Sequence, residues 1–262
     1  MKVPQEVIDF ATSTGNSFHS KVVAKFRENK WHTSVSPYYL DASTNRAREI
    51  DLIAEKAWSV PAFYGGGSRL HIKLFVECKY VAEKTVFWFD TKDVAAAKRW
   101  LARNTPLPDK INFYTDKHHY IQGGSTVAKL FGTKADRETD REAIYRALNQ
   151  ALHSMVYLSR KGSIIPNHEG GHLPSRIVEL PVIVVNSFDK FFRVDMGEEE
   201  VTPLRDNFLL EVNYAYLDPQ KGNRSEYFLV DVISYETLDD FFRSLEGDVD
   251  AMKPLMENLR SR

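Results

Sequence analysis

Four charged residues lie in two segments that alternate like strands of a half-buried sheet. Glu49 and Asp51 are two residues apart in the segment REIDLIAEK. Glu77 and Lys79 have the same spacing in LHIKLFVECKY. Side chains two residues apart in a strand point to the same face, about 6–7 Å from each other. Two carboxylates that face a lysine in this way suit the metal-assisted hydrolysis of a phosphodiester bond.

This chemistry gives each residue a role. Asp51 and Glu77 would hold Mg²⁺, a hard cation that prefers oxygen ligands, and Mn²⁺ would substitute for it. Lys79 would orient or deprotonate the attacking water and offset negative charge in the transition state. We therefore predict that Asp51, Glu77 and Lys79 are catalytic residues.

An acid two residues before a lysine is a simple pattern that also arises by chance. It occurs three times in the chain, at 28–30, 77–79 and 90–92. The first lies at the end of an expected helix and the third at a strand-to-helix turn, where charges are usually solvated. Only 77–79 lies in an apolar strand, where buried charges are costly unless they are paired or bound to a metal. The alternative is a structural ion pair between Asp51 and Lys79.

These segments resemble the motif of the PD-(D/E)XK, or restriction-endonuclease-like, nuclease superfamily. Asp51 would fill the aspartate position of that motif, and Glu77 and Lys79 the (D/E)XK positions. Residues 14–31 resemble the first helix of the family, and ALNQAL around Gln150 resembles a late core helix. The resemblance implies a Mg²⁺-dependent nuclease acting on DNA, with the main-chain carbonyl of Cys78 as a further metal ligand.

One position departs from the family pattern. Many relatives have a glutamate directly after the phenylalanine of the first helix, where this chain has His19. A neutral histidine does not supply the negative charge that favours a second Mg²⁺. We expect a one-metal site or a weakened enzyme, with His19, Glu49 and Gln150 as auxiliary residues and Glu49 replacing the missing acid. The competing hypothesis is an inactive protein of the same fold that acts as a nucleic-acid-binding or assembly subunit.

The overall charge gives no separate support for nucleic-acid binding. The chain has 35 basic and 36 acidic residues, so contacts with nucleic acid must come from a local patch. Lys21 lies on the expected helix at 16–31, Arg48 precedes the site strand, and Lys73 shares the strand face of Glu77. We expect these three side chains to contact phosphate groups.

The cysteine and histidine content argues against other chemistry. The single cysteine, Cys78, excludes an internal disulfide and a cysteine-rich zinc site, and its place on the apolar strand face predicts a packed side chain. His118 and His119, and His168 with His172, lie in loop-like sequence, so we interpret them as solvated rather than zinc-binding. The sequence has no signal-peptide core and no run of about twenty apolar residues, so we expect a cytoplasmic protein without membrane contacts.

The elements expected around the site indicate an α/β protein with a restriction-endonuclease-like core, in which helices flank a central mixed β-sheet. Hydrophobic periodicity predicts helices at 3–13, 16–31, 93–104 and 140–158. Strands are expected at 47–56, 70–80 and 85–90, with the first two forming a hairpin. Further strands are expected at 177–186, 189–196, 207–216 and 226–235, followed by one or two helices at 236–259.

A polar stretch at 160–176 divides the sequence into two parts. We assign 1–160 to the nuclease-like core and 161–262 to a β-rich extension with C-terminal helices, packed on the core as one compact unit. The segment PVIVV in the second part is apolar on both faces, as expected of a strand inside a covered sheet. A two-fold homodimer would allow cleavage of both DNA strands, and the β-rich part would supply its interface.

Overall fold

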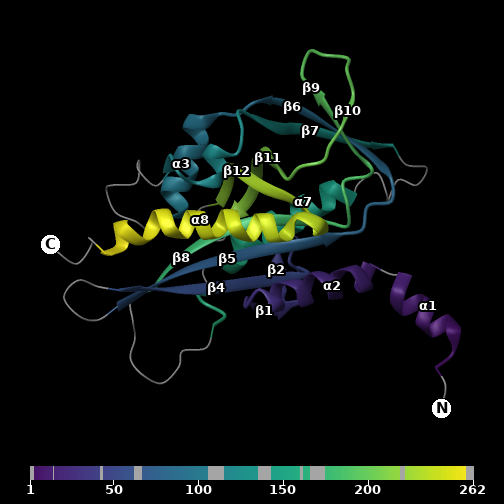
Figure 1. The fold of residues 1–262 in the computed structure, drawn as a ribbon, viewed down its shortest axis with the longest axis horizontal. Helices are drawn as coiled ribbons and strands as arrows, with labels where there is room; N and C mark the ends of the chain where they lie inside the picture. Colours follow the sequence, from purple (N-terminus) through teal and green to yellow (C-terminus); the bar gives the residue numbers. More distant parts are fainter. Residues whose placement is uncertain are drawn as a thin grey trace.

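The computed structural model describes residues 3–13, 15–41, 44–61, 67–105, 115–134, 143–159, 162–165, 175–218 and 222–257 (Figure 1). Helices flank a ten-stranded mixed sheet, and a separate sheet has two strands. The expected α/β class and the central mixed sheet between helices are therefore confirmed.

Most of the helices and strands lie where the periodicity of the sequence predicts them. The helices are α1 (Gln5–Ser13), α2 (Gly15–Glu28), α3 (Val94–Asn104), α5 (His119–Gln122), α7 (Ala143–Leu158) and α8 (Leu238–Glu257), with a 3₁₀ turn, η2 (Tyr235–Thr237). The strands are β1 (His32–Val35), β2 (Tyr38–Asp41), β3 (Arg46–Glu49), β4 (Leu52–Pro61), β5 (Gly67–Lys79), β6 (Lys84–Thr91), β7 (Thr126–Lys134), β8 (Ser175–Val185), β9 (Phe191–Asp195), β10 (Thr202–Pro203), β11 (Phe208–Asp218) and β12 (Gly222–Ser234).

The large sheet has the strand order β1-β4-β5-β8-β12-β11-β7-β6-β9-β10. β4 and β5 form the expected antiparallel hairpin, and β8 pairs with β5 in parallel along eleven residues. β12 is parallel to β8 and antiparallel to β11. Strands from the second half of the chain thus lie between β5 and β7, so the division at residue 160 does not coincide with a division of the sheet.

Helices cover both faces of the sheet around β5. On β4, Lys56 lies opposite Ile72 and its side chain reaches Glu246 of α8. Lys79 is an odd-numbered residue of β5, so its side chain lies on the face opposite to Ile72. It reaches Gln150 of α7. Because alternate residues of a strand face opposite sides, α8 and α7 cover opposite faces, with α8 in front of the sheet in Figure 1. The odd-numbered residues near the end of β5 therefore face α7.

α7 is an amphipathic helix with one wholly buried side. The buried residues recur at helical spacing and are Ile144, Ala147, Leu148, Ala151, Leu152, Ser154, Met155 and Leu158. Each large apolar side chain among them stabilises the packing by about 1.5–3 kcal/mol. This burial fixes the rotation of α7, so Gln150, which lies outside the buried stripe, reaches Lys79 of β5.

The strand expected at 47–56 is divided in the structure. Its first part, β3, is not in the large sheet and pairs with β2. Its second part, β4, begins only at Leu52. Ile50, which follows β3 in the sequence, is fully buried, and its N–H donates to the carbonyl of Pro37. The main-chain carbonyl of Asp51 accepts from Ser36, which has a left-handed φ of 51°. Asp51 therefore lies in a bend before β4 rather than within a strand.

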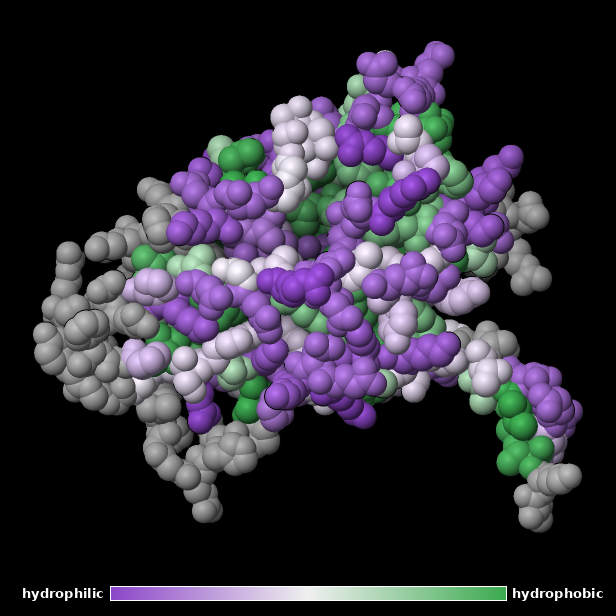
Figure 2. All heavy atoms as spheres, in the orientation of Figure 1, coloured by the Kyte–Doolittle hydropathy of each residue, from purple (hydrophilic) through white to green (hydrophobic). Residues whose placement is uncertain are grey.

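The visible surface mixes polar and apolar side chains without a large apolar face (Figure 2). The clearest apolar strip lies on α1, which extends away from the rest of the molecule, and includes the exposed side chains of Val7, Ile8 and Phe10. Within the described ranges, no helix is both long enough and apolar enough to cross a membrane.

Candidate active site

The β4–β5 hairpin brings Asp51 and Glu77 together. Leu52 lies opposite Val76, so the next step of the register places Asp51 beside Glu77. Oδ2 of Asp51 accepts a hydrogen bond of 2.8 Å from the main-chain N–H of Cys78, which fixes the carboxylate at the end of β5. Two acids that are 26 positions apart in sequence therefore share one small volume.

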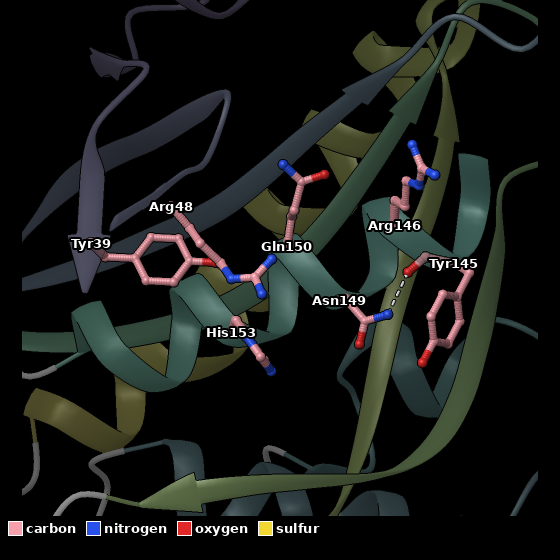
Figure 3. A pocket seen from close by; sticks show the side chains of 7 residues that line it. All are labelled: Tyr39, Arg48, Tyr145, Arg146, Asn149, Gln150 and His153. Atoms are coloured by element: carbon pink, nitrogen blue, oxygen red, sulfur yellow. Dashed lines mark hydrogen bonds between the residues drawn. The ribbon is translucent and has the colours of Figure 1, made fainter. Parts of the chain in front are cut away.

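Lys79 and Gln150 complete this group from the α7 side of the sheet. Nζ of Lys79 donates to Oε1 of Glu77 at 2.8 Å and to Oε1 of Gln150 at 3.4 Å. Nε2 of Gln150 in turn donates to the main-chain carbonyl of Glu49 at 3.4 Å. Gln150 also lines a pocket on the outer side of α7 (Figure 3). The lysine is thus held beside Glu77, and not by an ion pair with Asp51.

Glu77 has an unusual environment for a carboxylate. It is fully buried, and this burial, together with the nearby charge of Asp51, raises its pKa to about 8. Its Oε2 atom is buried without a hydrogen-bond partner among the described residues. Leaving such an oxygen unsatisfied costs about 1–3 kcal/mol. A cation bound between Glu77 and Asp51 would remove this cost and lower the pKa of Glu77.

The auxiliary residues Glu49 and His19 lie close to each other. Hydrogen bonds from Ser36 and Tyr38 lower the pKa of Glu49, and the charge of His19 acts in the same direction. Nε2 of His19 is buried without a hydrogen-bond partner in the described part of the chain. The carboxylate of Glu49 is therefore bonded to Ser36 and Tyr38, and only its main-chain carbonyl contacts Gln150 of the site.

The three residues expected to contact phosphate groups lie in different settings. Lys21 is exposed on α2. Arg48 is half-exposed, with Nε donating to the buried carboxylate of Asp41 at 2.6 Å. The expectation for Lys73 is wrong, because its side chain is only 1% exposed and donates to the carbonyl of Gly162 at 2.8 Å. Residues 162–165 cover this part of the strand face through hydrogen bonds to Glu55, a contact that strand alternation does not reveal.

Cys78 is buried against the apolar side of the hairpin, as its position in the strand predicts. Burial, together with the charges of Asp51 and Glu77, raises the pKa of its thiol well above the usual value. A thiol in this environment stays protonated and is a poor nucleophile. Its side chain contributes packing, and only its main chain adjoins the two acids.

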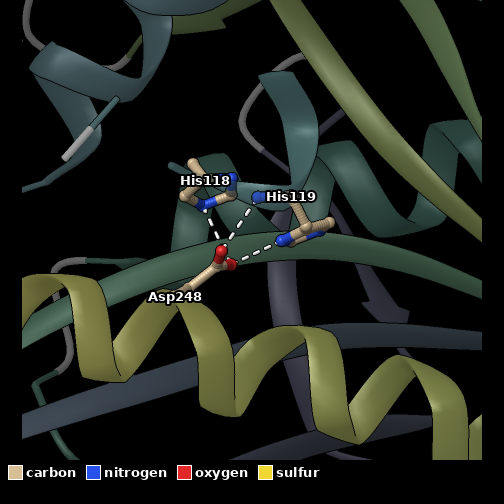
Figure 4. Close-up of side chains that lie close together, drawn as sticks. All are labelled: His118, His119 and Asp248. Atoms are coloured by element: carbon tan, nitrogen blue, oxygen red, sulfur yellow. Dashed lines mark hydrogen bonds and ion pairs between the residues drawn. The ribbon is translucent and has the colours of Figure 1, made fainter. Parts of the chain in front are cut away.

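The interpretation of His118 and His119 as solvated loop residues is wrong. His118 is fully buried, and His119 begins the short helix α5, which packs against α8. Both rings adjoin the buried carboxylate of Asp248, with a contact from His119 Nδ1 and a distance of 3.3 Å from His118 Nε2 (Figure 4). On its other side, His119 Nε2 lies 3.3 Å from Asp231. These acids are more than a hundred residues away in sequence, so no local pattern predicts the cluster.

The geometry of this cluster also suits a metal ion, because one ligand atom from each of His118, His119 and Asp248 lies within 4.8 Å of the others. Although burial opposes the charged form, Asp248 and Asp231 raise the pKa of His119 to about 10. Burial lowers the pKa of His118 to about 3. The N–H of Tyr120 donates to Nδ1 of His118, so the neutral ring has its proton on Nε2, the atom that faces Asp248. Without an ion, the cluster therefore holds a charged His119 and a neutral His118 beside Asp248.

We expect His119→Gln to destabilise the protein by about 3 kcal/mol near pH 6.5, because it leaves two buried carboxylates without their shared cation. The pKa of His119 is higher in the folded state than the ordinary value near 6.5, so its contribution is complete below about pH 6.5 and disappears as the pH rises through about 10. Urea unfolding of both proteins at pH 6.5 and pH 10 measures the effect. His32→Gln, at an exposed position of β1, is the control. A difference that stays constant between the two pH values would contradict the charged pairing.

His168 and His172 lie outside the described residues.

Comparisons of the chain with protein-family models, with curated proteins and with solved structures found no match.

Proposed function

We propose that the protein is a metal-dependent nuclease that hydrolyses phosphodiester bonds in DNA, with a restriction-endonuclease-like core formed around α2, β4, β5, α7 and β8. One observation above all supports this proposal. Glu77 is a buried carboxylate with one oxygen unsatisfied, placed beside a second carboxylate and bonded to a lysine. Most buried side-chain oxygens in proteins have a hydrogen-bond partner, so a buried carboxylate oxygen without one supports a site that binds a cation.

Asp51 and Glu77 would hold Mg²⁺ or Mn²⁺, with the main-chain carbonyl of Cys78 as the further ligand that the family resemblance implies. Carboxylate and carbonyl oxygens are the donors that these hard cations prefer, and the unsatisfied Oε2 of Glu77 fits such an ion. When bound, the ion supplies Lewis-acid stabilisation of the charge on the phosphate.

Side chains of the protein would position the attacking water and stabilise the charge on the phosphate. Lys79 is held between Glu77 and Gln150, so its ammonium group has a fixed place beside the carboxylates. From there it orients the attacking water and offsets the negative charge that grows on the phosphate oxygens. Gln150 acts through Lys79 and through the carbonyl of Glu49, and is therefore a positioning residue.

A second candidate function is nucleic-acid binding without cleavage, by an inactive protein of the same fold. The feature that favours it is His19, which stands where many members of the resembled nuclease family have a glutamate. A site with one carboxylate fewer binds divalent cations more weakly. This alternative retains the binding surface and loses the reaction.

Incubation with several substrates tests the proposal against this alternative. Purified protein is mixed with linear duplex, closed circular and single-stranded DNA, and with RNA, in Mg²⁺, Mn²⁺ or EDTA. The nuclease proposal expects cleavage of DNA that requires a divalent ion and stops in EDTA. Binding without cleavage in all ions would favour the inactive subunit.

The role of His19 can be tested by two substitutions. His19→Glu is expected to raise Mg²⁺-supported cleavage by about tenfold, and His19→Ala to lower it, because groups next to metal ligands change metal affinity or activity by roughly 10–100-fold. Cleavage rates across a Mg²⁺ titration measure both effects. If neither substitution shifts the Mg²⁺ dependence, His19 has no part in the site.

A further inference from the structure

A pocket of about 520 Å³ lies against the outer face of α7 (Figure 3). It adjoins the candidate active site, because Gln150 both lines the pocket and contacts Lys79. α7 provides one wall, and residues of β2 and β3 provide another, among them Tyr39 and Arg48. This volume lies within the usual range of small-ligand sites, about 300–1,000 Å³.

The charge of the pocket suits an anion. Arg48 and Arg146 both line it, and none of the described side chains that line it is acidic. The Nε atom of Arg48 is held by the fully buried Asp41, and Figure 3 shows its guanidinium group directed into the pocket. Asp41 also accepts a hydrogen bond from Thr44, which helps to keep Arg48 in this orientation. A preorganised guanidinium group of this kind suits a phosphate oxygen.

The same pocket offers aromatic and amide groups. Tyr145 lines the pocket and is 56% exposed, so its ring is open to a ligand. Asn149 is fixed by hydrogen bonds with Tyr214 and with the main chain of Tyr145. Burial lowers the pKa of His153, so this ring lines the pocket in its neutral form. Rings and amides next to guanidinium groups are the means by which proteins hold unpaired bases.

We propose that this pocket binds an unpaired nucleotide next to the scissile phosphate, so that the protein prefers nucleic acid with a single-stranded segment over blunt duplex. Arg48 and Arg146 contact the phosphate of this nucleotide, and Tyr145 stacks on its base. Bases inside a duplex are stacked on one another, so a base must be unpaired to reach Tyr145. The inference rests on the proposed function, because it assigns the substrate class of the same site.

The test measures binding rather than cleavage. Fluorescence anisotropy in EDTA, at one fixed salt concentration, compares a labelled blunt duplex with the same duplex extended by single-stranded nucleotides. We expect tighter binding of the extended substrate. Tyr145→Ala should weaken that binding about tenfold and leave blunt-duplex binding nearly unchanged, because stacking on one base is lost. Tyr145→Phe should retain the wild-type preference, since the ring is kept.

Arg146→Ala should weaken binding of the extended substrate in the same assay. Arg243→Ala is its matched control, because Arg243 is an exposed arginine on α8, across the sheet from α7. Equal affinity for blunt and extended duplex, or an unchanged preference in Tyr145→Ala, would overturn the assignment of the pocket. Binding that depends on Tyr145 in a protein that cleaves nothing would instead refute the proposed nuclease and leave the pocket in place.

Discussion

Lys79→Ala is expected to reduce the rate of DNA cleavage by about a thousandfold or more, while thermal stability changes little. The lysine acts on the attacking water and on the charge of the transition state, and removing one such group typically costs 10²–10⁴ in rate. The Lys79 side chain is 24% exposed, and burial with the charge of Asp51 already raises the pKa of Glu77 to about 8, so Glu77 stays protonated near neutral pH when its partner is lost. Initial cleavage rates in Mg²⁺ and thermal melts measure the two effects.

Lys56→Ala is the matched control for this substitution. Lys56 lies on the neighbouring strand β4, has a similar exposure of 21%, and pairs with Glu246 at 3.2 Å on the opposite face of the sheet. The Lys56→Ala protein should cleave DNA at the wild-type rate. Equal cleavage by wild type and Lys79→Ala would exclude Lys79 from the reaction.

Asp51→Asn is expected to remove both cleavage and the response of stability to metal. In the wild type, burial and the charge of Asp51 oppose ionisation of Glu77, and Mg²⁺ or Mn²⁺ relieves this repulsion, so either ion should raise the melting temperature, with a gain of about 2.7 kcal/mol at a hundred times the dissociation constant. Asp51→Asn loses a ligand charge together with the repulsion. It should be at least as stable as the wild type without metal, and gain little when Mn²⁺ is added. Thermal melts across a Mn²⁺ titration measure this.

A structural ion pair between Asp51 and Lys79 predicts the opposite result. Asp51→Asn would then be destabilised at every metal concentration, because the lysine would lose its partner. The contact of Lys79 with Glu77 at 2.8 Å already argues against such a pair. Asp90→Asn, at a half-exposed acid of β6, is a control that should keep the full response to Mn²⁺.

Local periodicity predicts the parts of the site that depend on one segment. The alternation of residues 70–80 places Glu77 and Lys79 on one face of β5, and turn residues between two apolar segments indicate the β4–β5 hairpin. The helical spacing of α7 likewise leaves Gln150 outside the buried stripe. These features follow from side-chain direction alone, which is set by residue number within an element.

Contacts between distant segments were not predictable in this way. The bend at Asp51 depends on hydrogen bonds exchanged with the chain at 36–37, and the burial of Lys73 depends on residues 162–165. His119 is charged because Asp231 and Asp248 reach it from β12 and α8. The place of β8 and β12 inside the large sheet is of the same kind, because strand order is decided by pairing between segments and not by the pattern within each.

The most direct test of the central claim is the rate of DNA cleavage by the wild type and by Lys79→Ala, purified in parallel and assayed in Mg²⁺ and in EDTA. We expect that only the wild type cleaves, only with the divalent ion, and that Lys79→Ala still shows the Mn²⁺-dependent rise in melting temperature. Cleavage that is equal in the two proteins, or that persists in EDTA, would contradict a metal-dependent nuclease site at Asp51, Glu77 and Lys79.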